Sequence, residues 1–273
     1  MRIGTNTAAT NTYSNLKSAN ASKAGSLAKL SSGLRINKAG DDAAGLSISE
    51  KMKNQISGLT QATRNAQDGI SLIQTAEGAL SETHSILNRM RDLSVQAANG
   101  TNSTDDLAAI GSEMTSLTTE IDRIATTTEF NEKALLDGTL ATDGVVLQIG
   151  ANTAAAVDTL EINISDMGSA GLGMGALAVE TAPSAAIDLI DAAITKVSTQ
   201  RTSLGANQNR LDHTINNLST TKENLSEANS RIVDVDMAEE MTSFTKSNIL
   251  SQAATSMLAQ ANQMPQSVLS LLQ

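Results

Sequence analysis

The sequence contains no cysteine, no tryptophan, one tyrosine, two phenylalanines and two prolines among 273 residues. Without cysteine, the chain forms no disulfide, has no thiol nucleophile and builds no cysteine-based metal site. With so few aromatic side chains, its core consists of Ala, Leu, Ile, Val and Met, which suit helix seams better than a sheet sandwich. The prolines stand at positions 183 and 265, so almost the whole chain is free of helix breakers.

Positive charge is also scarce, since 19 basic residues stand against 29 acidic ones for a net charge of −10. A nucleic-acid partner is not expected, because nucleic-acid binders normally present a basic face. The chain has no run of about 18 apolar residues, so we expect no membrane span. The N-terminus, "MRIGTNTAATNTYSNL", lacks the apolar run of a secretory signal peptide. Export, if it occurs, therefore uses a route that reads something other than a cleaved signal.

The residues of enzymatic sites are equally sparse. The two histidines, His84 and His213, each stand alone on a helical pattern, and the zinc-protease, nucleophile-elbow and phosphate-loop motifs are missing. "GDDAAG" is not a calcium loop, because calcium ligands alternate along the chain and end in a bidentate Glu. We predict a protein that is not an enzyme and has no cofactor and no metal.

Long helical patterns fill most of the chain. They run over about residues 6–34, 46–99, 107–124 and 183–264, and "NGTNSTDD" between the second and third predicts a turn with an N-cap at Thr104 or Asp105. The short turn makes the third helix antiparallel to the second. Pro183 fits the first turn of the fourth helix. In the second pattern, steps of three and four residues indicate a coiled-coil seam through Met52, Ile56, Leu59, Thr63, Ala66, Ile70, Ile73, Glu77, Leu80, His84 and Leu87. A neighbouring stripe predicts a second packing partner and consists of Leu72, Ala76, Ala79, Thr83, Ile86, Met90 and Leu93.

Residues 130–180 differ from the rest. "GVVLQIG" and "DTLEINIS" alternate apolar and polar residues, which predicts two strands joined by "ANTAAAV". "GSAGLGMGAL" is typical of a flexible, glycine-rich connector. The predicted fold is mainly α: a long antiparallel coiled-coil helical rod with one small β-hairpin region.

Residues 29–49, "KLSSGLRINKAGDDAAGLSIS", interrupt the helical pattern with three glycines and two aspartates. We interpret Asp41 as the cap of the next helix and Asp42 as favourable at the positive helix end. Arg35 and Lys38 pair either with these aspartates or with a neighbouring subunit.

The terminal segments carry apolar residues with little core around them, which favours self-association. Copies joined head to tail along a non-closing rotation form a helical filament. The alternative is an ordinary intramolecular bundle with a frayed tail.

Several segments resemble one family. "LSSGLRINKAGDDAAGLSISEKM" is similar to the N-terminal signature of bacterial flagellin, especially the short flagellins of Gram-positive bacteria. Other matching segments are "NAQDGISLIQTAEGAL", "TEFNEKALLDG", "VVLQIGAN", "LGANQNRLDHTINNL", "ANSRIVDVDMAEEM" and "ILSQAATSMLAQANQMPQSVLSLLQ".

The resemblance implies two domains. Residues 1–43 and 236–273 would form an inner filament-core domain, a coiled-coil layer of terminal helices that lines a channel. Residues 44–235 would form an outer rod domain with a small hairpin and loop insert near 143–180, which implies a thin, smooth filament. Residues 29–49 would be the hinge between the domains, with Gly33, Gly40 and Gly45 permitting the bend beside Arg35, Asp41 and Asp42.

The resemblance also implies a life cycle. The subunit would be exported unfolded through the flagellar export apparatus and polymerised at the filament tip for swimming motility. Its partners would be copies of itself, an export chaperone, an assembly factor, the filament cap and hook-associated proteins. Two alternatives are a hook–filament junction protein with the same terminal helices and a flagellin carrying a protease, but the insert lacks His and Cys.

Finally, the resemblance implies recognition by vertebrate flagellin receptors. "LNRMRDLSVQAAN" is similar to the segment bound by the toll-like receptor, with Arg89, Leu93 and Glu113 as the central contacts. The C-terminal residues sensed by inflammasome receptors match Val268, Leu269, Leu271 and Leu272, and Gln273 replaces the usual terminal Arg.

Overall fold

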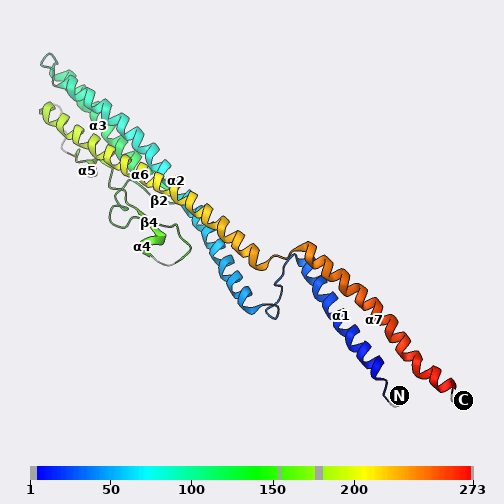
Figure 1. Ribbon diagram of the computed structural model, residues 1–273. Helices are drawn as coiled ribbons and strands as arrows, with labels where there is room; N and C mark the ends of the chain where they lie inside the picture. The colour runs from blue at the N-terminus through cyan, green and yellow to red at the C-terminus, as the bar shows by residue number, and fades with distance from the viewer. Residues whose placement is uncertain (1–4, 153–154, 176–180, 272–273) are drawn as a thin grey trace. The chain divides into compact units, whose positions relative to one another are not determined.

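The computed structural model describes residues 5–152, 155–175 and 181–271, and it divides into two compact units (Figure 1). Unit 1 comprises Met1–Asn54 and Asn224–Gln273, and unit 2 comprises Gln55–Glu223. Helices α2, Ala43–Ala97, and α6, Pro183–Val233, each contribute residues to both units. Pro183 opens α6, as predicted.

In unit 2, α2 and α6 pack together with α3, Thr104–Thr127, around one apolar core (Figure 1). The buried positions of α6 follow a seven-residue repeat through Ile190, Val197, Leu204, Leu211 and Leu218. This repeat is the spacing of a coiled-coil seam.

The seam of α2 differs in part from the predicted one. Its buried positions are Leu59, Ala62, Ala66, Ile73, Ala76, Leu80, Thr83, Leu87, Met90, Ser94 and Ala97. The predicted members Thr63, Ile70, Glu77 and His84 are only partly buried. Ala76, Thr83 and Met90 belong to the predicted second stripe and are buried, whereas the buried Ala62, Ser94 and Ala97 belong to neither predicted stripe. Apolarity alone did not distinguish these adjacent positions.

Two ion pairs show the relative direction of α2 and α6. Arg91 Nε lies 2.7 Å from Asp191 Oδ1, and Arg201 Nη2 lies 3.6 Å from Glu77 Oε1. The α2 position falls as the α6 position rises, so the two helices are antiparallel.

The N-cap of α3 is Ser103, so the predicted caps Thr104 and Asp105 were wrong by one and two residues. Ser103 Oγ accepts from the Asp106 N–H, and the Asp106 carboxylate accepts from the Ser103 N–H at 3.0 Å and from its hydroxyl at 2.7 Å. This reciprocal pattern is a capping box. The hydrogen bonds from Ser103, first that from its hydroxyl, lower the pKa of Asp106.

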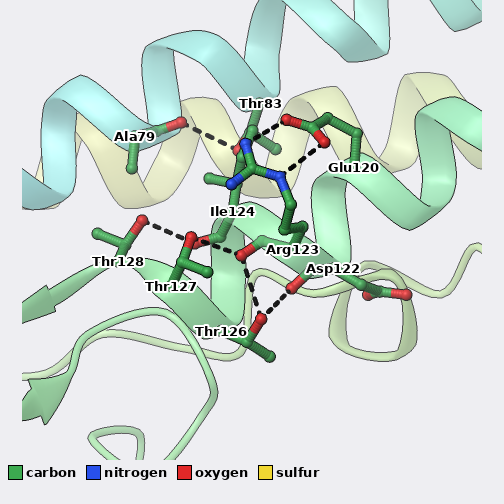
Figure 2. Close-up of polar contacts among 9 residues, drawn as sticks. All are labelled: Ala79, Thr83, Glu120, Asp122, Arg123, Ile124, Thr126, Thr127 and Thr128. Carbon is green, nitrogen blue, oxygen red and sulfur yellow. Dashed lines mark hydrogen bonds and ion pairs between the residues drawn. The ribbon is translucent and has the colours of Figure 1, made fainter.

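At the other end of α3, three threonines add hydroxyl donors to carbonyls near the end of the helix (Figure 2). Thr126, Thr127 and Thr128 donate their hydroxyls to the carbonyls of Asp122, Arg123 and Ile124 at 2.9, 2.7 and 2.7 Å. Arg123 pairs with Glu120 on the same helix through two hydrogen bonds.

Two hairpins follow α3. The first, β1 Glu129–Phe130 and β2 Lys133–Ala134, was not predicted; its two turn residues, Asn131 and Glu132, have φ of 51° and 64°. The second confirms the predicted strand pair: β3, Val145–Gln148, is antiparallel to β4, Thr159–Ile162. A short helix, α4 Ala155–Asp158, lies in the connection between them.

The hairpin packs on α2 at two glycines. A Cβ at Gly69 would lie 2.2 Å from Leu147 Cδ1, and a Cβ at Gly58 would lie 3.0 Å from Ala151 Cβ. Between them, Asn65 Nδ2 donates to the carbonyl of Gln148 at 2.9 Å.

The segment predicted to be a flexible connector is instead packed where the structure describes it. It forms α5, Ser169–Leu172, and buries Leu172. The Asp122 carboxylate accepts from the Ser169 N–H at 2.7 Å and from its hydroxyl at 2.8 Å. Lys196 Nζ donates to the carbonyl of Gly171. These partners come from α3 and α6, so the local sequence could not reveal the packing.

In unit 1, α1 Thr7–Ser32 and α7 Met237–Leu271 lie side by side and antiparallel (Figure 1). Lys23 Nζ donates to Asn248 Oδ1, and Ser251 Oγ donates to Asn20 Oδ1, both at 2.8 Å. The buried residues between the two helices are small: Ala19, Ser26, Ser247 and Ala261. This pair therefore buries little apolar side-chain area by itself.

Helix α7 continues through Pro265, where the sequence pattern had suggested its end. A proline has no N–H for the carbonyl four residues earlier, which here belongs to Ala261. Asn6 Nδ2 donates to that carbonyl at 2.8 Å, while Asn6 Oδ1 accepts from the Ala9 N–H as the N-cap of α1. One side chain thus caps α1 and replaces the hydrogen bond that Pro265 cannot make.

Candidate functional site

The predicted hinge residues lie in unit 1, where two connectors meet. The first connector, residues 33–42, joins α1 to α2, and the second, residues 234–236, joins α6 to α7. The Arg35 N–H donates to the Val233 carbonyl at 2.6 Å, and the Val235 N–H donates to the Gly33 carbonyl at 3.0 Å. These two bonds form an isolated antiparallel bridge between Leu34 and Asp234. We call this paired region the junction.

Gly33 ends α1 with φ of 72°, a left-handed conformation that favours glycine, and its N–H donates to the Lys29 carbonyl at 2.8 Å. Gly40 lies in the following turn, and a Cβ there would contact nothing within 4 Å. The left-handed backbone at Gly33 therefore favours glycine at this bend of the chain. At Gly40, by contrast, no contact requires glycine.

The interpretation of Asp41 as the helix cap was wrong. The cap of α2 is Asp42, whose Oδ1 accepts from the Gly45 N–H at 2.9 Å. Asp41 instead closes the preceding turn, where its Oδ2 accepts from the N–H groups of Lys38 at 2.9 Å and Asn37 at 3.0 Å. These bonds, first that from Lys38, lower the pKa of Asp41.

Gly45 lies within the first turn of α2, so it is not itself a bend. A Cβ at Gly45 would lie 2.5 Å from Asp42 Oδ2 and 2.7 Å from Cδ1 of the buried Ile36. Glycine here gives the capping carboxylate and Ile36 room against the helix.

The Arg35 side chain contacts α6, the helix that precedes the second connector. Its guanidinium donates to the carbonyl of Ile232 near the C-terminus of α6. Among the ion pairs of the residues that the structure describes, none joins Arg35 or Lys38 to Asp41 or Asp42. Arg35 therefore contacts the C-terminal end of α6 and does not form the ion pair with Asp41 or Asp42 that the sequence suggested.

Two further features of the junction were missed from the sequence. Asp236 caps α7 by accepting from the N–H groups of Ala238 at 2.9 Å and Glu239 at 3.2 Å. Asp236 and Glu239 have the spacing of a capping box, and this spacing could have predicted the cap from the sequence. The buried Ser49 donates to Asn229 Oδ1 at 2.8 Å, a contact between distant segments that no local signal indicates.

Beyond the junction, α1 and α7 expose much apolar surface. Of the twelve large apolar side chains exposed among the described residues, Val95, Val146 and Val157 belong to unit 2. The other nine belong to unit 1: Tyr13, Leu27, Ile48, Met237, Met241, Ile249, Leu250, Met257 and Met264. A groove of about 470 Å³ between α1 and α7 is lined partly by Ala19, Leu250 and Met257. Many exposed apolar side chains on one pair of helices indicate an interaction site.

The charge of the terminal segments is one-sided. The sequence has no acidic residue before Asp41 or after Glu240, whereas lysines stand at positions 17, 23, 29, 38 and 246. The acidity of the chain therefore lies in its middle.

The residues implied in toll-like receptor recognition lie in unit 2. Arg89 on α2 donates through Nε at 3.0 Å and Nη2 at 2.8 Å to Glu113 Oε1 on α3, and both side chains are exposed. Leu93 is 2% exposed and belongs to the core, so it does not share their surface.

The implied inflammasome contacts lie at the chain's end. Val268, Leu269 and Leu271 belong to α7, but their side chains are outside the described ones, and Leu272 lies outside the described residues.

Neither a metal centre nor a membrane span is found within residues 5–152, 155–175 and 181–271. In those ranges no three His, Cys, Asp or Glu side chains converge in a way that could hold a metal ion. No helix there combines the length and apolarity needed to cross a bilayer.

Comparison with known proteins identifies the family. The model described as the bacterial flagellin N-terminal helical region matches residues 3–141, and that of the bacterial flagellin C-terminal helical region matches residues 187–272. Flagellin of Bacillus subtilis strain 168 is 53% identical over 306 aligned residues and the full length of both chains. Flagellin of Halalkalibacterium halodurans is 53% identical over 246 residues and 89% of each chain.

A solved structure agrees. The crystal structure of Bacillus cereus flagellin has 38% sequence identity and a TM-score of 0.50, and the match covers 57% of this chain and 88% of that one. With both helical regions matched and a full-length relative at 53% identity, the chain belongs to the bacterial flagellin family.

Proposed function

We propose that this chain, a structural subunit of the bacterial flagellar filament, polymerises through its terminal helices α1 and α7 and has no catalytic role. The observation that carries the proposal is the concentration of exposed apolar side chains in unit 1. In the folded monomer these side chains stay exposed, and the buried positions that the structure describes between α1 and α7 are only Ala and Ser. Copies of the same chain would cover them.

The energetics favour this arrangement. Full burial of a Leu, Ile or Met side chain stabilises by roughly 1.5–3 kcal/mol. Ile249, Leu250 and Met257 are 60%, 50% and 58% exposed, so a large part of that stabilisation is still available to an interface. Repeated along a filament, such contacts stabilise a helical polymer of identical subunits.

The domain roles follow from this proposal. Residues 1–43 and 236–273 form the inner filament core, and residues 44–235 form the outer rod. The bridge at Leu34 and Asp234 supports this division, because it fastens together the two connectors through which the chain would pass from one domain to the other.

Export and assembly factors belong to the same proposal. The subunit leaves the cell unfolded through the flagellar export apparatus and polymerises at the tip under the filament cap. A chaperone, an assembly factor and hook-associated proteins bind its terminal segments. The small residues buried between α1 and α7 support this. Because the two segments bury little apolar area when paired, little offsets the entropy cost of ordering them, and they are easily kept unfolded.

Recognition by vertebrate receptors is proposed on narrower grounds. The exposed Arg89–Glu113 pair offers a toll-like receptor a fixed polar contact, and Leu93 supports it from the core. The C-terminal Val268, Leu269, Leu271 and Leu272 are proposed as the inflammasome determinant. The junction-protein alternative gains no support, because the two relatives described above are named flagellins.

Truncation tests the proposal. Purified full-length protein is expected to form filaments on seeding, and removal of residues 1–40 or 234–273 is expected to abolish polymerisation while unit 2 keeps its helical circular dichroism. If either trimmed protein forms normal filaments by electron microscopy, the terminal helices are not the assembly element.

A further inference from the structure

The turn between α2 and α3 contains the sole Asn-Gly pair of the sequence, Asn99–Gly100. Both residues are exposed, and a Cβ at Gly100 would meet nothing within 4 Å. Among the hydrogen bonds of the described residues, none uses the Asn99 side-chain amide or the Gly100 N–H. The backbone nitrogen of Gly100 is therefore unobstructed and unbound next to the carboxamide of Asn99.

A neighbouring asparagine provides the contrast. Asn102 lies in the same turn, but its Nδ2 donates to the Gln96 carbonyl at 2.6 Å. The N–H of the next residue, Ser103, donates to Asp106 in the capping box at 3.0 Å. The side-chain amide of Asn102 and the backbone N–H that follows it are thus both held by hydrogen bonds, unlike the same groups at Asn99 and Gly100.

The Asp-Gly pairs of the chain are held as well. Asp68–Gly69 lies inside α2. The Asp137 carboxylate accepts from the N–H and hydroxyl of Thr139, and Gly138 packs against Asp166. Gly144 packs against Asn163. Only at Asn99–Gly100 do exposure, an open glycine and free groups coincide among these pairs.

We propose that Asn99 is a site of spontaneous deamidation through a succinimide. The Gly100 nitrogen gives its proton to hydroxide, forming water, and attacks Asn99 Cγ. The Cγ–Nδ2 bond then breaks, and the amide nitrogen takes a proton from water and leaves as ammonia, which regenerates hydroxide. Water then adds to either ring carbonyl and breaks one of the two C–N bonds. The product is aspartate or isoaspartate at position 99, and the net change is amide plus water to carboxylate plus ammonium, with no oxidation or reduction.

The modification changes the local electrostatics. It places a negative charge two residues beyond the end of α2 at Ala97, where the partial negative charge of the helix end repels it. Isoaspartate also lengthens the backbone of the turn by one methylene. Long-lived subunits would therefore carry a turn that is chemically distinct from that of newly made ones.

A time course on the full-length protein tests the proposal. The protein is held in mildly alkaline buffer made with heavy-oxygen water, digested, and analysed by mass spectrometry with an isoaspartyl methyltransferase assay. Label is expected at position 99 well before position 102. Gly100→Ala adds a Cβ beside the attacking nitrogen and is expected to slow labelling by about tenfold, the factor given by a 1.4 kcal/mol rise in barrier.

Asn102→Gln is the matched control in the same turn and is expected to leave labelling at position 99 unchanged. Circular dichroism checks that the variants keep the parent fold. Two results would overturn the proposal: an amide at position 99 that survives as long as the one at position 102, or a Gly100→Ala variant that reacts at the parent rate.

Discussion

At the scale of single residues, the most informative side chain is Asn6, which joins the ends of α1 and α7. Its Oδ1 caps α1, and its Nδ2 donates to the Ala261 carbonyl that Pro265 leaves without a helical donor. The two functions use different atoms of one amide, so substitutions separate them.

Asn6→Asp keeps the capping acceptor but loses the donor, and it is expected to destabilise the α1–α7 pair by about 1 kcal/mol. Asn6→Ala loses both functions and is expected to cost about 1 kcal/mol more. In a Pro265→Ala background, position 265 regains an N–H, so the Asn6→Asp cost is expected to shrink. Hydrogen exchange of the α1 and α7 amides measures each effect. Equal costs for Asn6→Asp in both backgrounds would contradict the assignment.

Asp106 provides a pH-dependent case. Its pKa in the folded protein lies below the reference value of 3.8, because it accepts hydrogen bonds from Ser103. Its contribution to stability is therefore complete above the unfolded pKa and is lost as pH falls through the folded pKa. Amide protection in the first turn of α3 is expected to fall in that acidic range in the parent and not in Asp106→Ala. Asp105→Ala is the control and is expected to behave like the parent; identical profiles for all three proteins would contradict this role.

At the scale of elements, the glycines of α2 distinguish packing from helix propensity. Gly69 lies under the β3–β4 hairpin, where a Cβ would lie 2.2 Å from Leu147 Cδ1, whereas Gly78 has nothing within 4 Å. Gly78→Ala is expected to stabilise the protein by about 0.5–1 kcal/mol through helix propensity alone.

Gly69→Ala is expected to lose that gain, because Leu147 has to move, and Leu147→Ala in the same chain is expected to recover part of it. Urea unfolding monitored by circular dichroism measures these differences. If Gly69→Ala stabilises as much as Gly78→Ala, the hairpin does not pack on α2 as described.

The elements differ in how well they could be predicted from the sequence. The long helices and the β3–β4 hairpin were predictable, because their signals are periodic and local. The α5 turn and the β1–β2 hairpin were not, since the first depends on Asp122 and Lys196 from distant helices and the second on positive φ at Asn131 and Glu132. The caps of α2 and α3 were predicted to within one or two residues: the caps are Asp42 and Ser103, whereas their neighbours Asp41, Thr104 and Asp105 had been predicted. The Asp236 cap of α7 was missed.

At the scale of the whole molecule, the central claim is that the apolar surface of unit 1 is an assembly surface. Family membership was predictable from the sequence, since the terminal motifs are distinctive. The exposure of particular side chains was not, because periodicity shows that a residue is apolar but not whether a neighbour covers it. Leu93 and Leu250 are both apolar helix residues, yet one is buried and the other is 50% exposed.

Methionine oxidation is a direct test of this claim, because α7 carries exposed methionines at 237, 241, 257 and 264 while Met90, Met114 and Met167 are buried in unit 2. Monomers and filaments are treated with peroxide, and oxidation at each position is followed by mass spectrometry. Met237, Met241, Met257 and Met264 are expected to react quickly in monomers and to become protected in filaments, whereas the buried methionines are expected to be protected in both. Equal oxidation of the α7 methionines in monomers and filaments would contradict the claim.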